Sequence, residues 1–129
     1  MTKKYRLWDN IIGWVVFTVA AFTYLMTIEP TMSLWDCSEF IASAFKLEVG
    51  HPPGAPLFMI LGRFFANFAG GDVTKVAMMI NAMSAIASAL TILFLFWTIT
   101  HLARRIFLRQ ETDYTTGRII AVLGAGLTG

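Results

Sequence analysis

The chain has 129 residues, of which 57% are hydrophobic and 14% are charged, and its net charge is +2. This composition leaves too few polar side chains to coat a soluble domain and favours a membrane protein, while the small charge, without a basic stripe between aromatic residues, argues against a nucleic-acid partner. The single cysteine, Cys37, cannot form an internal disulfide, and no Cys/His spacing indicates a zinc site.

The first predicted element is a transmembrane helix. Residues 1–10 carry Lys3, Lys4 and Arg6, and the uncharged run 11–28 follows. A run of this length is sufficient to cross a hydrocarbon core about 30 Å thick. Basic residues before an apolar run also begin signal peptides, but no A-x-A-like cleavage site follows here. We therefore expect an uncleaved membrane anchor.

The loop 29–75 begins with a predicted amphipathic helix after Trp35. One stripe of this helix holds Phe40, Ile41, Ala44, Phe45 and Glu48, and such a stripe is typical of a helix in the membrane interface. Asp36 at the N-cap and Glu39 three residues later match a variant of the capping box. Two carboxylates at this spacing also share a helix face, where one can act as a base and the other can bind a metal or a sugar hydroxyl. The spacing does not choose between these interpretations.

A proline-rich corner follows, with the sequence GHPPGAP at residues 50–56. Pro52 and Pro53 stop the preceding helix, and the flanking glycines permit sharp turns, so a rigid corner is predicted. His51 is then either a polar residue of this corner or a hydrogen-bond donor directed at a substrate.

Residues 57–68 form a short apolar helix that Arg63 interrupts. This helix is too short to be a span, and we interpret it as re-entrant or interfacial. The more frequent fate of an arginine such as Arg63 is to reach the lipid headgroups; the alternative is to bind the phosphate of a lipid-linked substrate.

The second predicted span covers residues 76–100, which are uncharged and rich in the small side chains that allow close helix packing. Asp72 is a candidate N-cap before this span. Asn81 is the one strongly polar side chain within it, and such a residue more often holds neighbouring helices together than conducts a substrate.

Basic residues at the two distal ends predict the topology. Lys3, Lys4 and Arg6 precede the first span, and the loop 101–118 after the second span contains Arg104, Arg105 and Arg109. The positive-inside rule then places both ends in the cytoplasm and the loop 29–75 outside. We expect a multi-pass protein of the inner (cytoplasmic) membrane. A third apolar run, residues 119–129, stops about halfway through a span's length, so the chain is expected to be the amino-terminal piece of a longer protein.

Two motifs carry a resemblance to a known family. WDCSEF at residues 35–40 and GHPPGAPLF at residues 50–58 resemble the signature of a membrane family plentiful in Bacteroidetes, glycosyltransferase family 117, first catalogued only as being of unknown function. Its members are similar to GT-C glycosyltransferases, and its animal relatives are protein O-mannosyltransferases. The two motifs at this distance are hard to produce by chance. Ser38 departs from the animal pattern, which usually has Gly there, and this leaves the sugar open.

The resemblance implies an all-α, polytopic transmembrane protein with a GT-C-like amino-terminal portion. It implies an inverting transfer of a sugar, mannose being one candidate, from a polyprenyl-phosphate donor to an outward-facing acceptor hydroxyl on protein Ser or Thr. Asp36 is the implied general base, Glu39 and His51 would orient acceptor or sugar, and Arg63, a divalent metal or a basic residue elsewhere would meet the leaving phosphate. No cofactor is assigned, membrane lipid is an expected partner, and residues 1–129 alone are expected to be inactive.

A second hypothesis is a transporter or a noncatalytic subunit of a membrane assembly. Transport paths usually place ionisable residues within the spans, and neither 11–28 nor 76–100 contains one. The enzyme hypothesis is therefore favoured.

Overall fold

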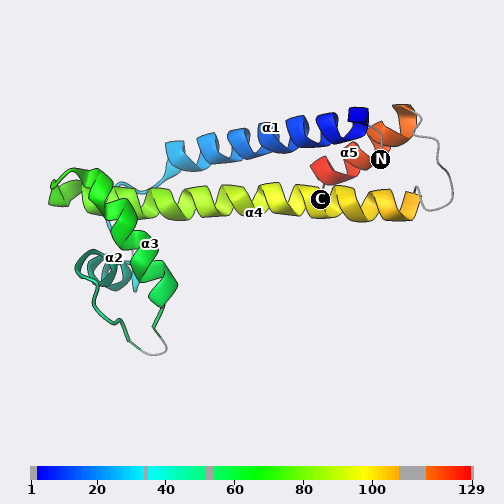
Figure 1. Ribbon diagram of the computed structural model, residues 1–129. Helices are drawn as coiled ribbons and strands as arrows, with labels where there is room; N and C mark the ends of the chain where they lie inside the picture. Colours follow the sequence, from blue (N-terminus) through cyan, green and yellow to red (C-terminus); the bar gives the residue numbers. More distant parts are fainter. Residues whose placement is uncertain (1–2, 34, 52–53, 108–115, 129) are drawn as a thin grey trace. The chain divides into compact units, whose positions relative to one another are not determined.

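The computed structural model describes residues 3–33, 35–51, 54–107 and 116–128, and these residues form helices without any strand (Figure 1). This confirms the predicted all-α class. The elements in chain order are α1 (Lys3–Thr27), α2 (Cys37–Lys46), α3 (Pro56–Ala66), the 3-10 helices η1 (Asn67–Ala69) and η2 (Val73–Lys75), α4 (Val76–Phe107) and α5 (Thr116–Thr128).

By length and composition, two of the described helices could cross a membrane, over Lys4–Thr27 and Val73–Arg105. Both extend past the apolar runs that predicted them: α1 begins before residue 11, and α4 continues beyond residue 100 into the predicted loop 101–118. Lys and Arg are good helix formers, so a charged residue ends the apolar run without ending the helix. Residues 108–115, which include Arg109, lie outside the described residues.

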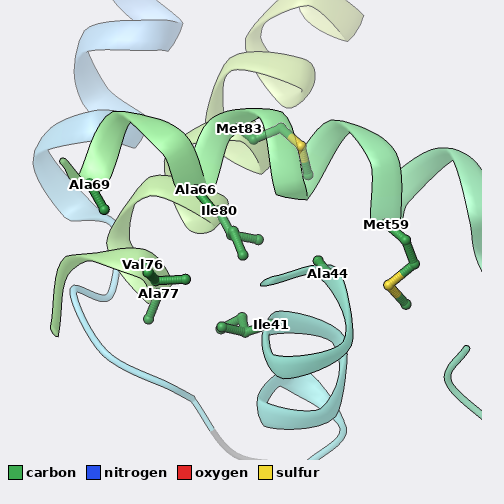
Figure 2. Packing of buried hydrophobic residues seen from close by; sticks show 9 residues of the cluster. All are labelled: Ile41, Ala44, Met59, Ala66, Ala69, Val76, Ala77, Ile80 and Met83. Atoms are coloured by element: carbon green, nitrogen blue, oxygen red, sulfur yellow. The ribbon is translucent and has the colours of Figure 1, made fainter. Parts of the chain in front are cut away.

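The chain divides into two compact units, and we call Tyr24–Ala87 the loop unit and Met1–Thr23 with Ser88–Gly129 the end unit. The core of the loop unit brings together α2, α3, η1 and the start of α4 (Figure 2). Its buried members are Ile41, Ala44, Met59, Ala66, Ala69, Val76, Ala77, Ile80 and Met83. Burial of this apolar surface fixes α2 against α3 and so positions the residues on either side of α2.

The close packing of α3 against α2 depends on Gly62. A Cβ atom at this position would lie 2.8 Å from the Cβ of Ala44, which is completely buried. Since two carbon atoms cannot approach so closely, the crossing requires that position 62 has no side chain.

The core of the end unit combines one residue of α1 with residues of α4 and α5. It contains Tyr5, Phe96, Ala103, Ile119, Val122 and Leu123. A Cβ atom at Gly126 would lie 2.6 Å from Cγ2 of Thr100, so α5 also packs closely against α4. Small residues therefore allow close helix contacts in this unit as they do in the loop unit.

The predicted capping box at the start of α2 is wrong. Asp36 occupies the N-cap position, but its side chain makes no capping hydrogen bond within the described residues, and Glu39 binds another partner. Ser43, a polar residue within α2, is buried. The predicted cap at Asp72 is confirmed: its carboxylate accepts a hydrogen bond from Thr74 N at 3.0 Å, although the helix it caps is η2, just before α4.

Candidate functional site

The partner of Glu39 is His51, twelve residues along the chain. Oε1 of Glu39 accepts a hydrogen bond from the backbone N of His51 at 2.8 Å, and Nδ1 of the His51 ring lies 2.9 Å from Oε1 and 2.8 Å from Oε2. A carboxylate only accepts, so the hydrogen bond assigns a proton to Nδ1. In the neutral ring, Nε2 is then the acceptor nitrogen.

The turn that ends α2 makes this pairing possible. Leu47 adopts a left-handed conformation with φ 57°, and Glu48 N donates to Ser43 O at 2.9 Å. This is the hydrogen-bonding pattern of a Schellman-type helix end, which reverses the direction of the chain. The reversal returns residues 50 and 51 to the first turn of α2.

Small and aromatic neighbours shape the space around the pair. A Cβ atom at Gly50 would lie 3.2 Å from Oε1 of Glu39, so this glycine leaves room for the carboxylate. The Phe40 ring meets the His51 ring edge-to-face with centroids 6.3 Å apart, and it meets Phe58 in the same way at 5.6 Å. Such edge-to-face contacts limit the orientation of the imidazole.

The two side chains shift each other's pKa in opposite directions. Hydrogen bonds from the backbone N–H and the ring of His51 hold the pKa of Glu39 below its usual value. The hydrogen bond to Glu39 and its negative charge raise the pKa of His51, and the charge of Asp36 adds a smaller contribution. Asp36, Glu39 and His51 thus form one electrostatic group at the start of α2.

Replacing Glu39 with Gln is expected to lower the pKa of His51, because the ring loses its anionic acceptor. A histidine titration by NMR measures this, with His51→Gln to assign the signal. Stabilisation by the pair requires charged Glu39 and protonated His51: it is lost as pH falls through the lowered pKa of Glu39 and as pH rises through the raised pKa of His51. Glu48→Gln is the matched control, since Glu48 pairs with Lys46 at 3.9 Å. An unchanged His51 titration in Glu39→Gln would contradict the assignment.

Asp36 lies beside this pair as an exposed carboxylate. Its backbone O accepts from Phe40 N at 3.0 Å, while its side chain makes no capping hydrogen bond within the described residues. The preceding residue, Trp35, is 89% exposed and has φ 71°. A bulky residue in the left-handed region is strained, and such strain occurs most often at functional sites. Nothing in the sequence marks Trp35 for this conformation, because no Gly or Asn stands there.

A family model described as "Protein O-mannosyl-transferase TMEM260 N-terminal domain" matches residues 36–129. The match begins at Asp36 and includes Glu39 and His51. The chain belongs to the TMEM260 N-terminal domain family. This confirms the predicted relation to animal protein O-mannosyltransferases, whereas membership of the bacterial glycosyltransferase family 117 stays a prediction.

Two relatives of this TMEM260 family are similar to the chain. "Protein O-mannosyl-transferase tmem260" of Dictyostelium discoideum is 33% identical over 85 residues, which cover 66% of this chain and 10% of that protein. "Protein O-mannosyl-transferase TMEM260" of Mus musculus is 32% identical over 89 residues, covering 68% of this chain and 12% of that protein. The matched part therefore amounts to about a tenth of the length of these relatives. No solved structure matches the chain.

Arg63 of this TMEM260-type domain has a partner that the sequence did not predict. Its Nη1 donates to the backbone O of Phe45 at 2.6 Å, and its guanidinium carbon lies 5.1 Å from the centroid of the Phe45 ring. A cation at the end of a helix stabilises the last carbonyl groups. Arg63 therefore joins α3 to the end of α2, and among the described residues its hydrogen bond goes to Phe45 rather than to Glu39 or His51.

Asn81 fastens the segment that leads toward the site. Its Nδ2 donates to the backbone O of Glu29 at 2.8 Å and of Thr31 at 3.1 Å. The sequence predicts that Asn81 holds helices together. In the structure it instead holds the segment that follows α1 against α4. This contact restrains the chain just before Trp35 and Asp36.

An apolar cavity of about 370 Å³ adjoins the Glu39–His51 pair at Gly50. It is lined by Leu47, Glu48, Val49, Gly50, Gly54, Ala55, Pro56, Met59 and Ile60. Pro52 and Pro53 of the predicted rigid corner lie outside the described residues. In the part of the chain that the structure describes, no three His, Cys, Asp or Glu side chains gather as metal ligands.

Proposed function

We propose that the intact protein is a membrane-embedded protein O-glycosyltransferase that moves a sugar from a polyprenyl-phosphate donor to a Ser or Thr hydroxyl of an outward-facing protein. The names of the TMEM260 relatives favour mannose as the sugar. The observation that carries the proposal is the exposed carboxylate of Asp36 beside the Glu39–His51 pair, at the start of the region that matches the TMEM260 family.

In this proposal Asp36 is the general base. The acceptor oxygen attacks the anomeric carbon, its proton passes to the Asp36 carboxylate, and the bond from the anomeric carbon to the phosphate oxygen breaks with inversion. A carboxylate can perform this role when it lies within about 3 Å of the hydroxyl. Asp36 suits the role because it is exposed and its side chain is not occupied in capping α2 within the described residues.

Glu39 and His51 are proposed to orient the acceptor or the sugar. Their mutual hydrogen bonds fix the imidazole and leave Nε2 available to a hydroxyl group. The leaving phosphate is an anion and requires a positive partner. Arg63 can supply this positive charge. A guanidinium has five N–H groups, and the hydrogen bond to Phe45 uses one of them. A divalent metal or a basic residue elsewhere in the intact protein are the alternatives.

The experiment uses the full-length protein in proteoliposomes with radiolabelled polyprenyl-phosphate mannose and a protein acceptor. We expect label on Ser or Thr, and polyprenyl-phosphate glucose is the control donor. Residues 1–129 alone are expected to be inactive, since two spans cannot enclose a lipid-linked donor. Absence of label from both donors with the full-length protein would overturn the proposal.

The transporter hypothesis gains no support, because Asn81, the polar residue of the second span, binds the carbonyl groups of Glu29 and Thr31.

The proposed topology places the loop 29–75 outside the cytoplasm. In a Cys37→Ala background, a cysteine at Ser33 or Gly71 is expected to react with a membrane-impermeant thiol reagent added to intact cells. A cysteine at Thr112, which lies outside the described residues, is expected to react only after the membrane is opened. The opposite pattern of labelling would place Asp36 on the cytoplasmic side and remove the acceptor from its reach.

A further inference from the structure

A second cavity, of about 280 Å³, lies in the end unit and is lined by aromatic and charged or polar side chains. The first turns of α1 contribute Arg6 and Asp9, and the last turns of α4 contribute Trp97, His101 and Arg104. The cavity shares no residue with the Glu39–His51 pair or its apolar neighbour, and the proposed transfer chemistry gives it no role.

The polar groups of this cavity are incompletely paired. Oδ1 of Asp9 and Nε1 of Trp97 are buried and have no hydrogen-bond partner among the residues that the structure describes. A buried acceptor or donor without a partner is unfavourable, and a hydroxyl group bound in the cavity can satisfy the Asp9 carboxylate. Nη2 of Arg104 lies 3.4 Å from Nδ1 of His101, which also lines the cavity.

The position of the cavity along both helices indicates its depth. Arg6 and Asp9 precede the apolar run 11–28, and His101 and Arg104 follow the apolar run 76–100. Side chains just beyond the ends of two spanning runs lie at the level of the lipid headgroups. Trp97, one turn inside, is typical of the boundary between headgroups and hydrocarbon.

We propose that this cavity binds the headgroup of an anionic phospholipid. Arg6 and Arg104 bind the phosphodiester, and Asp9 accepts a hydrogen bond from a headgroup hydroxyl. Two guanidinium groups and one carboxylate give the lining one excess positive charge when His101 is neutral, and a phosphodiester carries one negative charge. Basic pockets between membrane helices bind such headgroups. Phosphatidylglycerol has the phosphate and the hydroxyl groups without a cation that the two arginines would repel.

The test measures lipid retention by the full-length protein in native mass spectrometry, with phosphatidylglycerol and phosphatidylcholine of the same acyl chains. Wild type is expected to retain phosphatidylglycerol preferentially. Arg104→Gln is expected to weaken this retention about fivefold, the effect of one basic side chain at a membrane surface. Arg105→Gln is the matched control, because Arg105 is exposed and is not among the residues that line the cavity.

Arg6→Gln is the second variant, in α1, and is expected to weaken the retention of phosphatidylglycerol to a similar extent. Far-ultraviolet circular dichroism confirms that the variants keep their helices. Equal retention of the two lipids by wild type, or equal losses in Arg104→Gln and Arg105→Gln, would overturn the proposal. Inorganic phosphate at millimolar concentration distinguishes a lipid site from a site for soluble anions. We expect phosphatidylglycerol to stay bound in its presence. Displacement of the lipid by phosphate would overturn the assignment to a membrane lipid.

Discussion

Replacing Asp36 with Asn is expected to lower sugar transfer by the full-length protein by about 10²–10⁴-fold, the usual contribution of a general base. The amide has nearly the shape of the carboxylate but cannot accept the acceptor's proton at neutral pH. The amount of folded protein is expected to stay the same, because the Asp36 side chain makes no capping hydrogen bond within the described residues. Initial transfer rates, normalised to folded protein in the membrane, measure the effect.

Asp36→Ala distinguishes the base from a cap. Replacing a capping Asp with Ala lowers the free energy of unfolding by about 1 kcal/mol, whereas Asn caps a helix about as well as Asp. If Asp36 acts only as a base, Asn and Ala are equally stable and equally inactive. Asp72→Ala is the matched control, since Asp72 caps η2 through Thr74: it should lower stability and leave transfer per folded molecule unchanged. Normal transfer by Asp36→Asn would exclude Asp36 as the base.

Replacing Gly62 with Ala is expected to destabilise the loop unit by about 1–3 kcal/mol, as overpacking of a core does. The added methyl group would lie 2.8 Å from the Cβ of Ala44, a side chain that has no other rotamer into which to move. Relief therefore requires α2 to shift away from α3, which would also displace Glu39 and Asp36. Urea-induced unfolding of the full-length protein in detergent measures the stability, and the transfer assay reports the displacement.

The compensating variant is Ala44→Gly combined with Gly62→Ala. Removing the Ala44 methyl group opens the space that the new methyl group needs, so the double variant is expected to be more stable than the sum of the single effects predicts. Gly117→Ala is the control, because no heavy atom lies within 4 Å of a Cβ there. Additive effects of the Ala44 and Gly62 substitutions would show that the two positions are not in contact.

The order and type of the elements could be predicted from the sequence. Long apolar runs identified α1 and α4, because a membrane span is a property of composition and length. The stripe that begins at Phe40 predicted α2, and the local turn chemistry of Asp72 predicted a cap that the structure confirms. The two motifs around Asp36 and His51 indicated the relation to protein O-mannosyltransferases, which the family match supports.

The connections within the candidate site were decided by the tertiary structure. The local rule gave Glu39 a backbone partner three residues away, but the reversal at Leu47 brings His51 within hydrogen-bond distance. No glycine marks that reversal, so the sequence carries no signal for it. Arg63 likewise binds a carbonyl group on another helix. Local patterns determine which residues form a helix, whereas a hydrogen bond between distant residues depends on how the helices pack, because the packing sets which donors and acceptors come within reach.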